Sequence, residues 1–232
     1  MKIAIITARG GSKRIPRKNV RPFCGRPMIA WAIRAAQASK LFEHIIVTTE
    51  DVEIASIAEQ YGASVPFIRP LELADDFTHA HVAARHALEW AQEHIGIVSH
   101  FCHIYPTAPF LSPEVLEEGF RKISTTSARH VFTGVKLNYP LYQALVQDNN
   151  GQLKAVFPPP LAQMRSQDMP EVFFDAGQMY WFEVAHFLQN ELEIGPASAI
   201  VEIPPSDAID IDTEQDWNTA EQIAEQKGLV WS

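Results

Sequence analysis

The sequence predicts an α/β domain with a mostly parallel sheet and helices on both of its faces. Two observations lead to this prediction. Short apolar runs typical of buried strands alternate along the chain with longer segments in which apolar residues recur at helical spacing. The chain also has 232 residues, 47% of them hydrophobic, which suits a single domain (1–232) with a full core. Strands separated by helices generally run parallel, so a Rossmann-like arrangement is expected.

The first half of the chain follows this alternation closely. Pro27 predicts the start of the first helix, because its φ angle is already fixed near the helical value. Asp51 predicts the N-terminal cap of the second helix, and Gly62 predicts its end. A third helix is expected at 78–94. The strands of this half are expected at 2–7, 45–49, 65–68 and 101–105.

The alternation continues to about residue 135 and resumes near residue 200. Ser112 and Pro113 predict the start of a fourth helix, and the next strand is expected at 131–135. After the break, a strand is expected at 200–203 and a last helix at 213–227.

The segment 136–182 breaks this rhythm. It is interrupted by prolines at positions 140, 158, 159, 160 and 170, and it carries the aromatic residues Tyr139, Tyr142, Phe157, Phe173 and Phe174. We expect an inserted hairpin arm that packs on a second subunit, because exposed aromatic residues favour a buried position. A long irregular surface loop is the alternative, although loops of this length are uncommon in compact domains.

A basic loop with two glycines follows the first predicted strand. Residues 8–19 read Ala-Arg-Gly-Gly-Ser-Lys-Arg-Ile-Pro-Arg-Lys-Asn, and no acidic residue occurs before Glu43. Ten of the 19 Lys and Arg residues lie in the first 42 positions, although the whole chain has a net charge of −9. Glycine lets backbone N–H groups approach an anion and basic side chains neutralise it, so the loop predicts a phosphate site. A solvated basic loop without function is the alternative.

The spacing of the loop excludes two common phosphate-binding motifs. A P-loop needs a second glycine five positions after the first, but Ile15 and Pro16 occupy those places. The dinucleotide-binding pattern also fails, because Gly10 and Gly11 are adjacent and no third glycine follows at the right distance. The positive charge is local, whereas a nucleic-acid-binding face needs a wider basic surface. We therefore expect a small anionic ligand and no nucleic-acid partner.

A pair of carboxylates near the C-terminus gives the second signal. In the run Ile209-Asp210-Ile211-Asp212, a strand would point both aspartates to one face and both isoleucines into the core. Two carboxylate oxygens at a strand end can hold Mg²⁺ and leave positions for water and phosphate oxygens. The alternative is that Asp212 only caps the last helix.

Other parts of the chain give weaker signals. His79, His81 and His86 do not predict zinc, since helix residues two apart point in different directions. No Gly-x-Ser-x-Gly elbow supports a nucleophile. Cys24 and Cys102 are expected to be free thiols in the cytoplasm. No signal peptide or membrane span is predicted.

Tyr105-Pro106-Thr107-Ala108-Pro109 follows a predicted central strand. Because ligands gather beyond the carboxyl ends of strands in open α/β sheets, this segment is expected at the site. A turn shaped only by the two prolines is the alternative.

Taken in order, these motifs resemble those of a known enzyme family. Residues 8–19, Ile46-Val47-Thr48-Thr49, Arg69-Pro70-Leu71-Glu72-Leu73, the segment from Tyr105 to Pro109, and Asp210-Ile211-Asp212-Thr213 are similar to the cytidylyltransferases that activate nonulosonic acids, the CMP-sialic acid synthetase group. The resemblance implies a fold of the nucleotide-diphospho-sugar transferase type. It also implies transfer of CMP from CTP to a nine-carbon acidic sugar, with Mg²⁺ as cofactor and Mn²⁺ as a substitute. The family's arm exchanges between the subunits of a homodimer.

The resemblance assigns roles to individual residues. Nucleotide binding falls to Ala8, Arg9, Gly10, Gly11, Ser12, Lys18, Asn19, Arg69, Pro106 and Thr107. Arg9 and Lys18 are also expected to be catalytic, together with the metal ligands Asp210 and Asp212.

Two departures from the sialic-acid pattern bear on the sugar. Tyr105 stands where those enzymes usually have Gln, and residues 173–178 read Phe-Phe-Asp-Ala-Gly-Gln in place of Phe-Arg-Pro-Asn-Gly-Ala. The second motif resembles the pseudaminic acid branch, whose products serve cell-surface and flagellin glycosylation. The expected sugar contacts are Tyr105, Arg165, Asp175, Gly177 and Gln178. The alternatives are N-acetylneuraminic, legionaminic or ketodeoxyoctonic acid as substrate, or a nucleotide sensor without catalysis.

Overall fold

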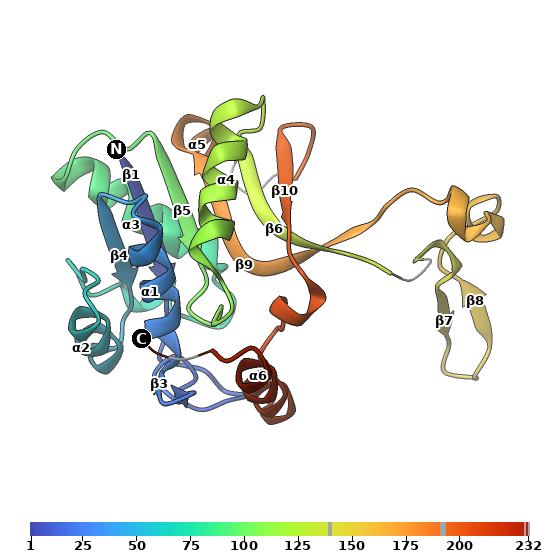
Figure 1. The fold of residues 1–232 in the computed structure, drawn as a ribbon, viewed down its shortest axis with the longest axis horizontal. Helices are drawn as coiled ribbons and strands as arrows, with labels where there is room; N and C mark the ends of the chain where they lie inside the picture. Colours follow the sequence, from blue (N-terminus) through green and yellow to red (C-terminus); the bar gives the residue numbers. More distant parts are fainter. Residues whose placement is uncertain (139–140, 191–193, 230, 232) are drawn as a thin grey trace.

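The computed structural model describes residues 1–138, 141–190, 194–229 and 231. Its core is a six-stranded sheet with the strand order β10-β6-β9-β5-β1-β4 (Figure 1). The strands are β1 (Lys2–Thr7), β4 (His44–Thr48), β5 (His100–Ile104), β6 (His130–Lys136), β9 (Phe173–Glu183) and β10 (Ser198–Glu202). β1 runs parallel to β4 and β5, and β10 runs parallel to β6, whereas β9 is antiparallel to both of its neighbours. The predicted α/β class with a mostly parallel sheet is confirmed.

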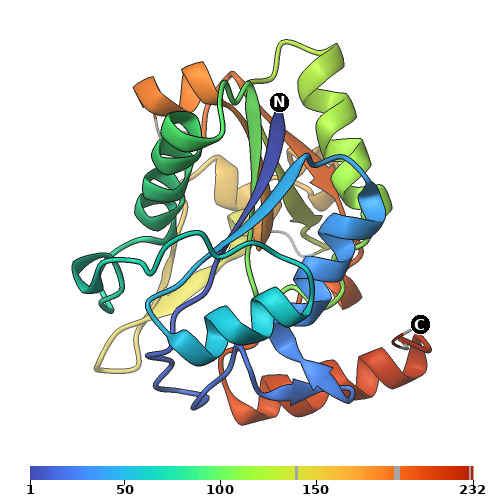
Figure 2. The same cartoon turned by 90° about the vertical axis from the view of Figure 1, so that its left-hand side faces the viewer.

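Helices cover both faces of the sheet (Figure 2). One face packs against α1 (Met28–Ser39), α2 (Val52–Gln60) and α4 (Pro113–Thr125), and the other against α3 (Ala80–His94) and α5 (Val184–Asn190). Within β1, Ala4 and Ile6 belong to the first of these cores and Ile3 and Ile5 to the second. This burial on both sides explains why the strand reads as a continuous apolar run. No helix within the described residues combines the length and the apolar character needed to cross a membrane.

The last helix packs at one end of the molecule. α6 (Glu214–Gln226) contributes Trp217 to a third apolar cluster, which includes Phe23 of the small hairpin formed by β2 (Pro22–Phe23) and β3 (Arg26–Pro27). The Trp217 and Phe23 rings meet edge to face, with centroids 5.6 Å apart. This cluster also holds Ile15 and Ile211, so it anchors the basic loop and the two-aspartate segment in one place.

Two of the predicted strands do not form. In place of a strand at 65–68, only the preceding Ser64 pairs with β4, through a single bridge to Ile46. Pro66 lacks the N–H group that a continued ladder would need. Residues 208–212 are irregular rather than a strand, although the buried Ile211 still alternates with the more exposed Asp210 and Asp212.

The interruption after β6 is shorter than the predicted 136–182, because β9 occupies the end of that range. Among the described residues, 137–138 and 141–172 form the arm, which projects away from the sheet in Figure 1. Short 3-10 turns and one hairpin make up its regular structure, the hairpin pairing β7 (Leu145–Gln147) with β8 (Leu153–Ala155). Tyr139 and Pro140, on which the prediction partly depended, lie outside the described residues.

Candidate active site

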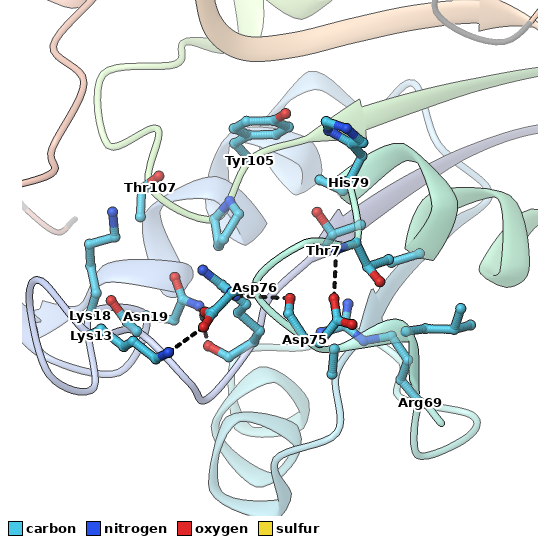
Figure 3. Close-up of a pocket in the computed structure, with 18 of the residues that line it drawn as sticks. Thr7, Lys13, Lys18, Asn19, Arg69, Asp75, Asp76, His79, Tyr105 and Thr107 are labelled. Atoms are coloured by element: carbon cyan, nitrogen blue, oxygen red, sulfur yellow. Dashed lines mark hydrogen bonds and ion pairs between the residues drawn. The ribbon is translucent and has the colours of Figure 1, made fainter. Parts of the chain in front are cut away.

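A cavity of about 710 Å³ opens at the edge of the sheet where β1 and β5 end (Figure 3). The loop after β1, the segment from Arg69 to Ala80, and the turn after β5 form its wall. Seven of the ten residues assigned to nucleotide binding line this cavity: Arg9, Ser12, Lys18, Asn19, Arg69, Pro106 and Thr107. The structure therefore brings together three segments that lie far apart in the sequence.

The cations of the basic loop are held by carboxylates from three other segments. Arg9 donates to Asp76 at 2.9 Å, and Lys13 also pairs with Asp76. Arg14 lies 2.7 Å from Asp212. Two further pairs, Lys18 with Asp212 at 3.3 Å and Arg17 with Asp51, complete the set. The loop therefore forms part of the cavity wall, and each of its basic side chains has a carboxylate partner.

The two glycines of the loop differ from the predicted arrangement. The N–H of Gly10 donates to Oε1 of Glu50 at 2.7 Å, so this group is already used within the protein. A Cβ placed on Gly10 would lie 3.0 Å from Cγ of Asp51 and closer still to its Oδ2. Gly10 therefore allows the loop to approach the turn between β4 and α2. Ala8, Gly10 and Gly11 do not line the cavity, whereas Ser12 does.

Arg69 and Asn19 are buried polar side chains in the cavity wall. Arg69 is 4% exposed; its guanidinium pairs with Glu50 at 2.7 Å and donates to the carbonyl oxygens of Ala8 and Thr48. Burial lowers the pKa of Arg69 below its ordinary value, and Glu50 opposes that effect. The Asn19 amide donates to the carbonyl of Arg9 at 2.9 Å. Both contacts fix the backbone of residues 8–9 before any ligand is present.

The segment that carries the two aspartates is held from both sides. Lys18 donates to the carbonyl of Ile211 at 2.6 Å, and the capping box of α6 is formed by Thr213 and Asp216. The side chain of Asp212 is therefore not the helix cap, which removes the alternative explanation for this residue. Instead it faces Arg14 and Lys18, beside the cavity.

The donor set of this segment fits a hard divalent cation. Reduced hydration raises the pKa of Asp210, and the nearby charge of Asp212 raises it further. A divalent cation between the two carboxylates would relieve that repulsion. Among the described residues, no group of three or more His, Cys, Asp or Glu side chains is close enough to hold a metal ion. Water and phosphate oxygens would have to supply the remaining ligands.

Comparison with known proteins identifies the family of this chain. The family model for cytidylyltransferases matches residues 3–190. The chain belongs to the cytidylyltransferase family. It is 36% identical over 214 residues to the pseudaminic acid cytidylyltransferase of Campylobacter jejuni, covering 92% of each chain. It is 31% identical over 228 residues to the CMP-N,N'-diacetyllegionaminic acid synthase of the same organism, covering 98% of this chain and 96% of the relative.

A solved structure supports the fold of this cytidylyltransferase. CMP:2-keto-3-deoxy-manno-octonic acid synthetase, solved in complex with CTP, superimposes with a TM-score of 0.69. The match covers 97% of this chain and 99% of that one, at 14% sequence identity. The nucleotide-diphospho-sugar transferase type of fold, predicted from the resemblance, is therefore confirmed.

In this cytidylyltransferase, the two departures from the sialic-acid pattern meet in space. The hydroxyl of Tyr180 donates to Oδ2 of Asp175 at 2.8 Å, and the rings of Tyr105 and Tyr180 lie 5.5 Å apart. Burial raises the pKa of Tyr105, and the carboxylates of Asp175 and Asp210 raise it further. A bulge in β9 makes this possible, because Gly177 has a φ of +62° and donates its N–H to Asp175.

Of the five expected sugar contacts, only Tyr105 lines the cavity. Gln178 is 4% exposed, and its amide donates to the carbonyl of Asp207, so it holds the segment before the two aspartates. Arg165 lies on the arm, where its exposed side chain pairs with Asp168 at 2.6 Å. It does not line the cavity of its own chain. Asp175 and Gly177 do not line the cavity either; Asp175 is linked to Tyr105 only through Tyr180, whose ring lies 5.5 Å from that of Tyr105.

Sequence reasoning missed several residues of the site. Thr7 lines the cavity and shares a 2.8 Å hydrogen bond with the buried His103, whose pKa is lowered to about 3 by burial. The acidic segment around Asp75 and Asp76 lines the cavity and pairs with Arg9 and Lys13 of the basic loop. The Arg69-Pro70-Leu71-Glu72-Leu73 motif, which ends just before that segment, was the available signal. His79 lines the cavity with its ring stacked on His81, at 5.4 Å between centroids.

Proposed function

We propose that this cytidylyltransferase transfers CMP from CTP to the anomeric hydroxyl of a nonulosonic acid, and that the acid is pseudaminic acid. The observation that carries the proposal is that the basic loop lines the cavity and pairs, through Arg14 and Lys18, with Asp212 beside it. A cavity of about 710 Å³ is large enough for a nucleotide and part of a sugar. The 36% sequence identity to a pseudaminic acid cytidylyltransferase, over 92% of both chains, supports the choice of acid.

The reaction needs orientation and charge neutralisation. The anomeric hydroxyl loses its proton to water as its oxygen forms a bond to the α-phosphorus. The bond from that phosphorus to the bridging oxygen breaks, and pyrophosphate leaves. Arg9 and Lys18 would bind the triphosphate oxygens, and their charge would favour the transition state, in which negative charge shifts to the leaving group. Asp210 and Asp212 would hold Mg²⁺. When bound, the metal would supply Lewis-acid polarisation of the α-phosphate.

Sugar selection is assigned to the cluster of Tyr105, Tyr180 and Asp175. Pseudaminic acid carries two acylamino groups, and their N–H groups need acceptors. Asp175 is such an acceptor, and it is oriented by the hydroxyl of Tyr180 and the N–H of Gly177. Its negative charge disfavours the sugar carboxylate here, so that carboxylate needs a cation from elsewhere. Discrimination against N-acetylneuraminic acid should be strong, because an acceptor covered by a sugar without the matching donor is left unsatisfied.

We also propose a homodimer with the arm at its interface. An isolated two-stranded hairpin is marginally stable in water, yet β7 and β8 contact no other sheet among the described residues. Four apolar side chains of the arm, Leu145, Val146, Leu153 and Val156, are between 47% and 63% exposed. A second copy would cover them. Arg165 would then be available to bind the sugar carboxylate in the other subunit's cavity.

The reducing cytoplasm is the compartment that fits this enzyme. Cys24 and Cys102 are both free thiols, as expected where disulfides are rare. The CMP-sugar made there would supply the glycosylation of cell-surface glycans or flagellin.

The test is pyrophosphate release from CTP and Mg²⁺ with each of four acids: pseudaminic, N-acetylneuraminic, legionaminic and ketodeoxyoctonic. We expect the highest kcat/KM with pseudaminic acid, loss of activity with EDTA, and recovery with Mg²⁺ or Mn²⁺. A higher kcat/KM with another acid would reject the assigned sugar but keep the reaction. CTP binding without pyrophosphate release from any acid would favour a nucleotide sensor.

A further inference from the structure

Glu50 contacts two groups of the site without lining the cavity itself. It follows β4 and lies in the turn before α2. Its Oε1 accepts the N–H of Gly10 at 2.7 Å, and its Oε2 pairs with Nη2 of Arg69 at 2.7 Å. One carboxylate therefore joins the basic loop to a side chain of the cavity wall. The two partners are 40 and 19 residues away in the sequence.

The pair between Glu50 and Arg69 is largely removed from solvent. The Arg69 side chain is 3% exposed and that of Glu50 is 12% exposed. The guanidinium also donates to the carbonyl of Ala8 at 3.2 Å, while its Nε is buried without a partner. Removing one member of such a pair leaves the other charge buried and uncompensated, so the remaining side chain would have to reorient.

The neighbouring carboxylate holds the other end of the loop. Asp51 pairs with Arg17, whose φ of +57° places it in the left-handed region. Asp51 also caps α2 by accepting the N–H groups of Glu53 and Ile54. The turn of Glu50 and Asp51 thus fixes the loop at residue 10 and at residue 17. The cations in between face the cavity or the two-aspartate segment.

We propose that Glu50 is a positioning residue for the CMP transfer reaction. It orients Arg69 and the loop at Gly10 before CTP binds. The proposal rests on the proposed function only in that CTP is the nucleotide bound. Its consequence is specific. Affinity for CTP should depend on the charge of a residue that the nucleotide does not touch.

Glu50→Gln separates the two contacts. Glutamine keeps an oxygen that accepts the N–H of Gly10, but it loses the charge that pairs with Arg69. We expect the Kd for CTP, measured by calorimetry well below the Tm, to rise by at least about tenfold, the size associated with a lost hydrogen bond to a charged group. The kcat at saturating CTP should change less than the KM does. Glu50→Asp restores the charge and should recover part of the affinity.

The matched control is Glu118→Gln. Glu118 accepts two hydrogen bonds from Arg121 at 2.6 Å on the exposed surface of α4, so the same substitution breaks an ion pair of the same chemistry. We expect an unchanged Kd for CTP. A Glu50→Gln variant that has a lower Tm but the wild-type Kd would show a purely structural role and would overturn the proposal.

A double-mutant cycle tests the route through Arg69 and covers the case in which Glu50→Gln folds poorly. Arg69→Met removes the charge that would be left unpaired. If Glu50 acts through Arg69, adding Glu50→Gln to Arg69→Met should change the Kd by less than about twofold, since contacting residues are not additive. If each substitution lowers the affinity for CTP fully and the two effects multiply in the double variant, the proposal is overturned. Failure of the wild-type protein to bind CTP would reject the proposed function instead, and it is seen before any variant is made.

Discussion

Replacing Gly10 by alanine tests the close approach of the basic loop to Asp51. A Cβ at this position would lie 3.0 Å from Cγ and 3.1 Å from Cβ of Asp51. A Cβ on Gly11 would meet no heavy atom within 4 Å. Gly11→Ala is therefore a matched control, because it adds the same methyl group one residue further along the chain.

The size of the effect follows from what Asp51 would lose by moving. Its carboxylate accepts the N–H groups of Glu53 at 2.9 Å and Ile54 at 3.0 Å, and it also pairs with Arg17. A lost helix cap costs about 0.5–2 kcal/mol, and overpacking costs about 1–3 kcal/mol. We expect Gly10→Ala to lower the free energy of unfolding by about 1–3 kcal/mol. For a chain of this length, each kcal/mol lowers the Tm by about 2–4 °C.

Calorimetry and steady-state kinetics measure the two consequences. The Tm of Gly10→Ala should fall by about 2–12 °C, whereas that of Gly11→Ala should change little, as for most exposed sites. The KM for CTP should rise in Gly10→Ala only, because the loop moves away from the turn that holds it. Equal Tm and KM values in the two variants would refute the reasoning.

Other parts of the molecule give three further expectations. Asp212→Asn should lower kcat by about 10²–10³-fold, with a smaller rise in the KM for CTP, because the lost contact acts mainly on the transition state. Glu214→Gln is the control and should keep the wild-type kcat. Unchanged turnover of Asp212→Asn at saturating Mg²⁺ would contradict the metal assignment. Replacing both Leu145 and Leu153 with Asp should convert a dimer into a monomer of 26.0 kDa by light scattering, and a monomeric wild type would reject the interface. Arg17 holds the pKa of the Asp51 carboxyl below its usual range, so the contribution of Asp51 to stability is present above the unfolded pKa of about 3.9 and is lost as the pH falls below it. The difference in Tm between wild type and Asp51→Asn should therefore narrow below about pH 4. A difference that widens there would contradict this.

Local patterns predicted the first half of the fold well. The apolar run of β1, the cap at Asp51 and the helix start at Pro113 each depend on residues close in sequence, and all three appear as expected. The basic loop could be located for the same reason. The acidic partners of the loop could not be located from the sequence, because Asp76 and Asp212 come close to it only in the tertiary fold.

β9 was missed because its sequence combines two kinds of structure. Residues 180–182 are buried and pair on both sides, but Asp175 and Gly177 form a bulge, and prolines precede them. The predicted strand at Asp210 failed for the opposite reason. Its alternation of polar and apolar residues is real, but it arises because Ile211 packs into the cluster with Trp217 rather than into a sheet. Periodicity alone cannot distinguish these cases.

The division of β9 has a consequence for how such enzymes diversify. Its residues 180–182 pair with both β5 and β6, while Asp175 lies where the strand leaves β5 and pairs with β6 only. Tyr105 likewise follows the last residue of β5. Under the proposed function, substitutions at these two positions would change which sugar is accepted, while residues 180–182 keep their pairing with both neighbouring strands. On that proposal, enzymes of this kind would exchange one acidic sugar for another through residues outside the doubly paired part of β9.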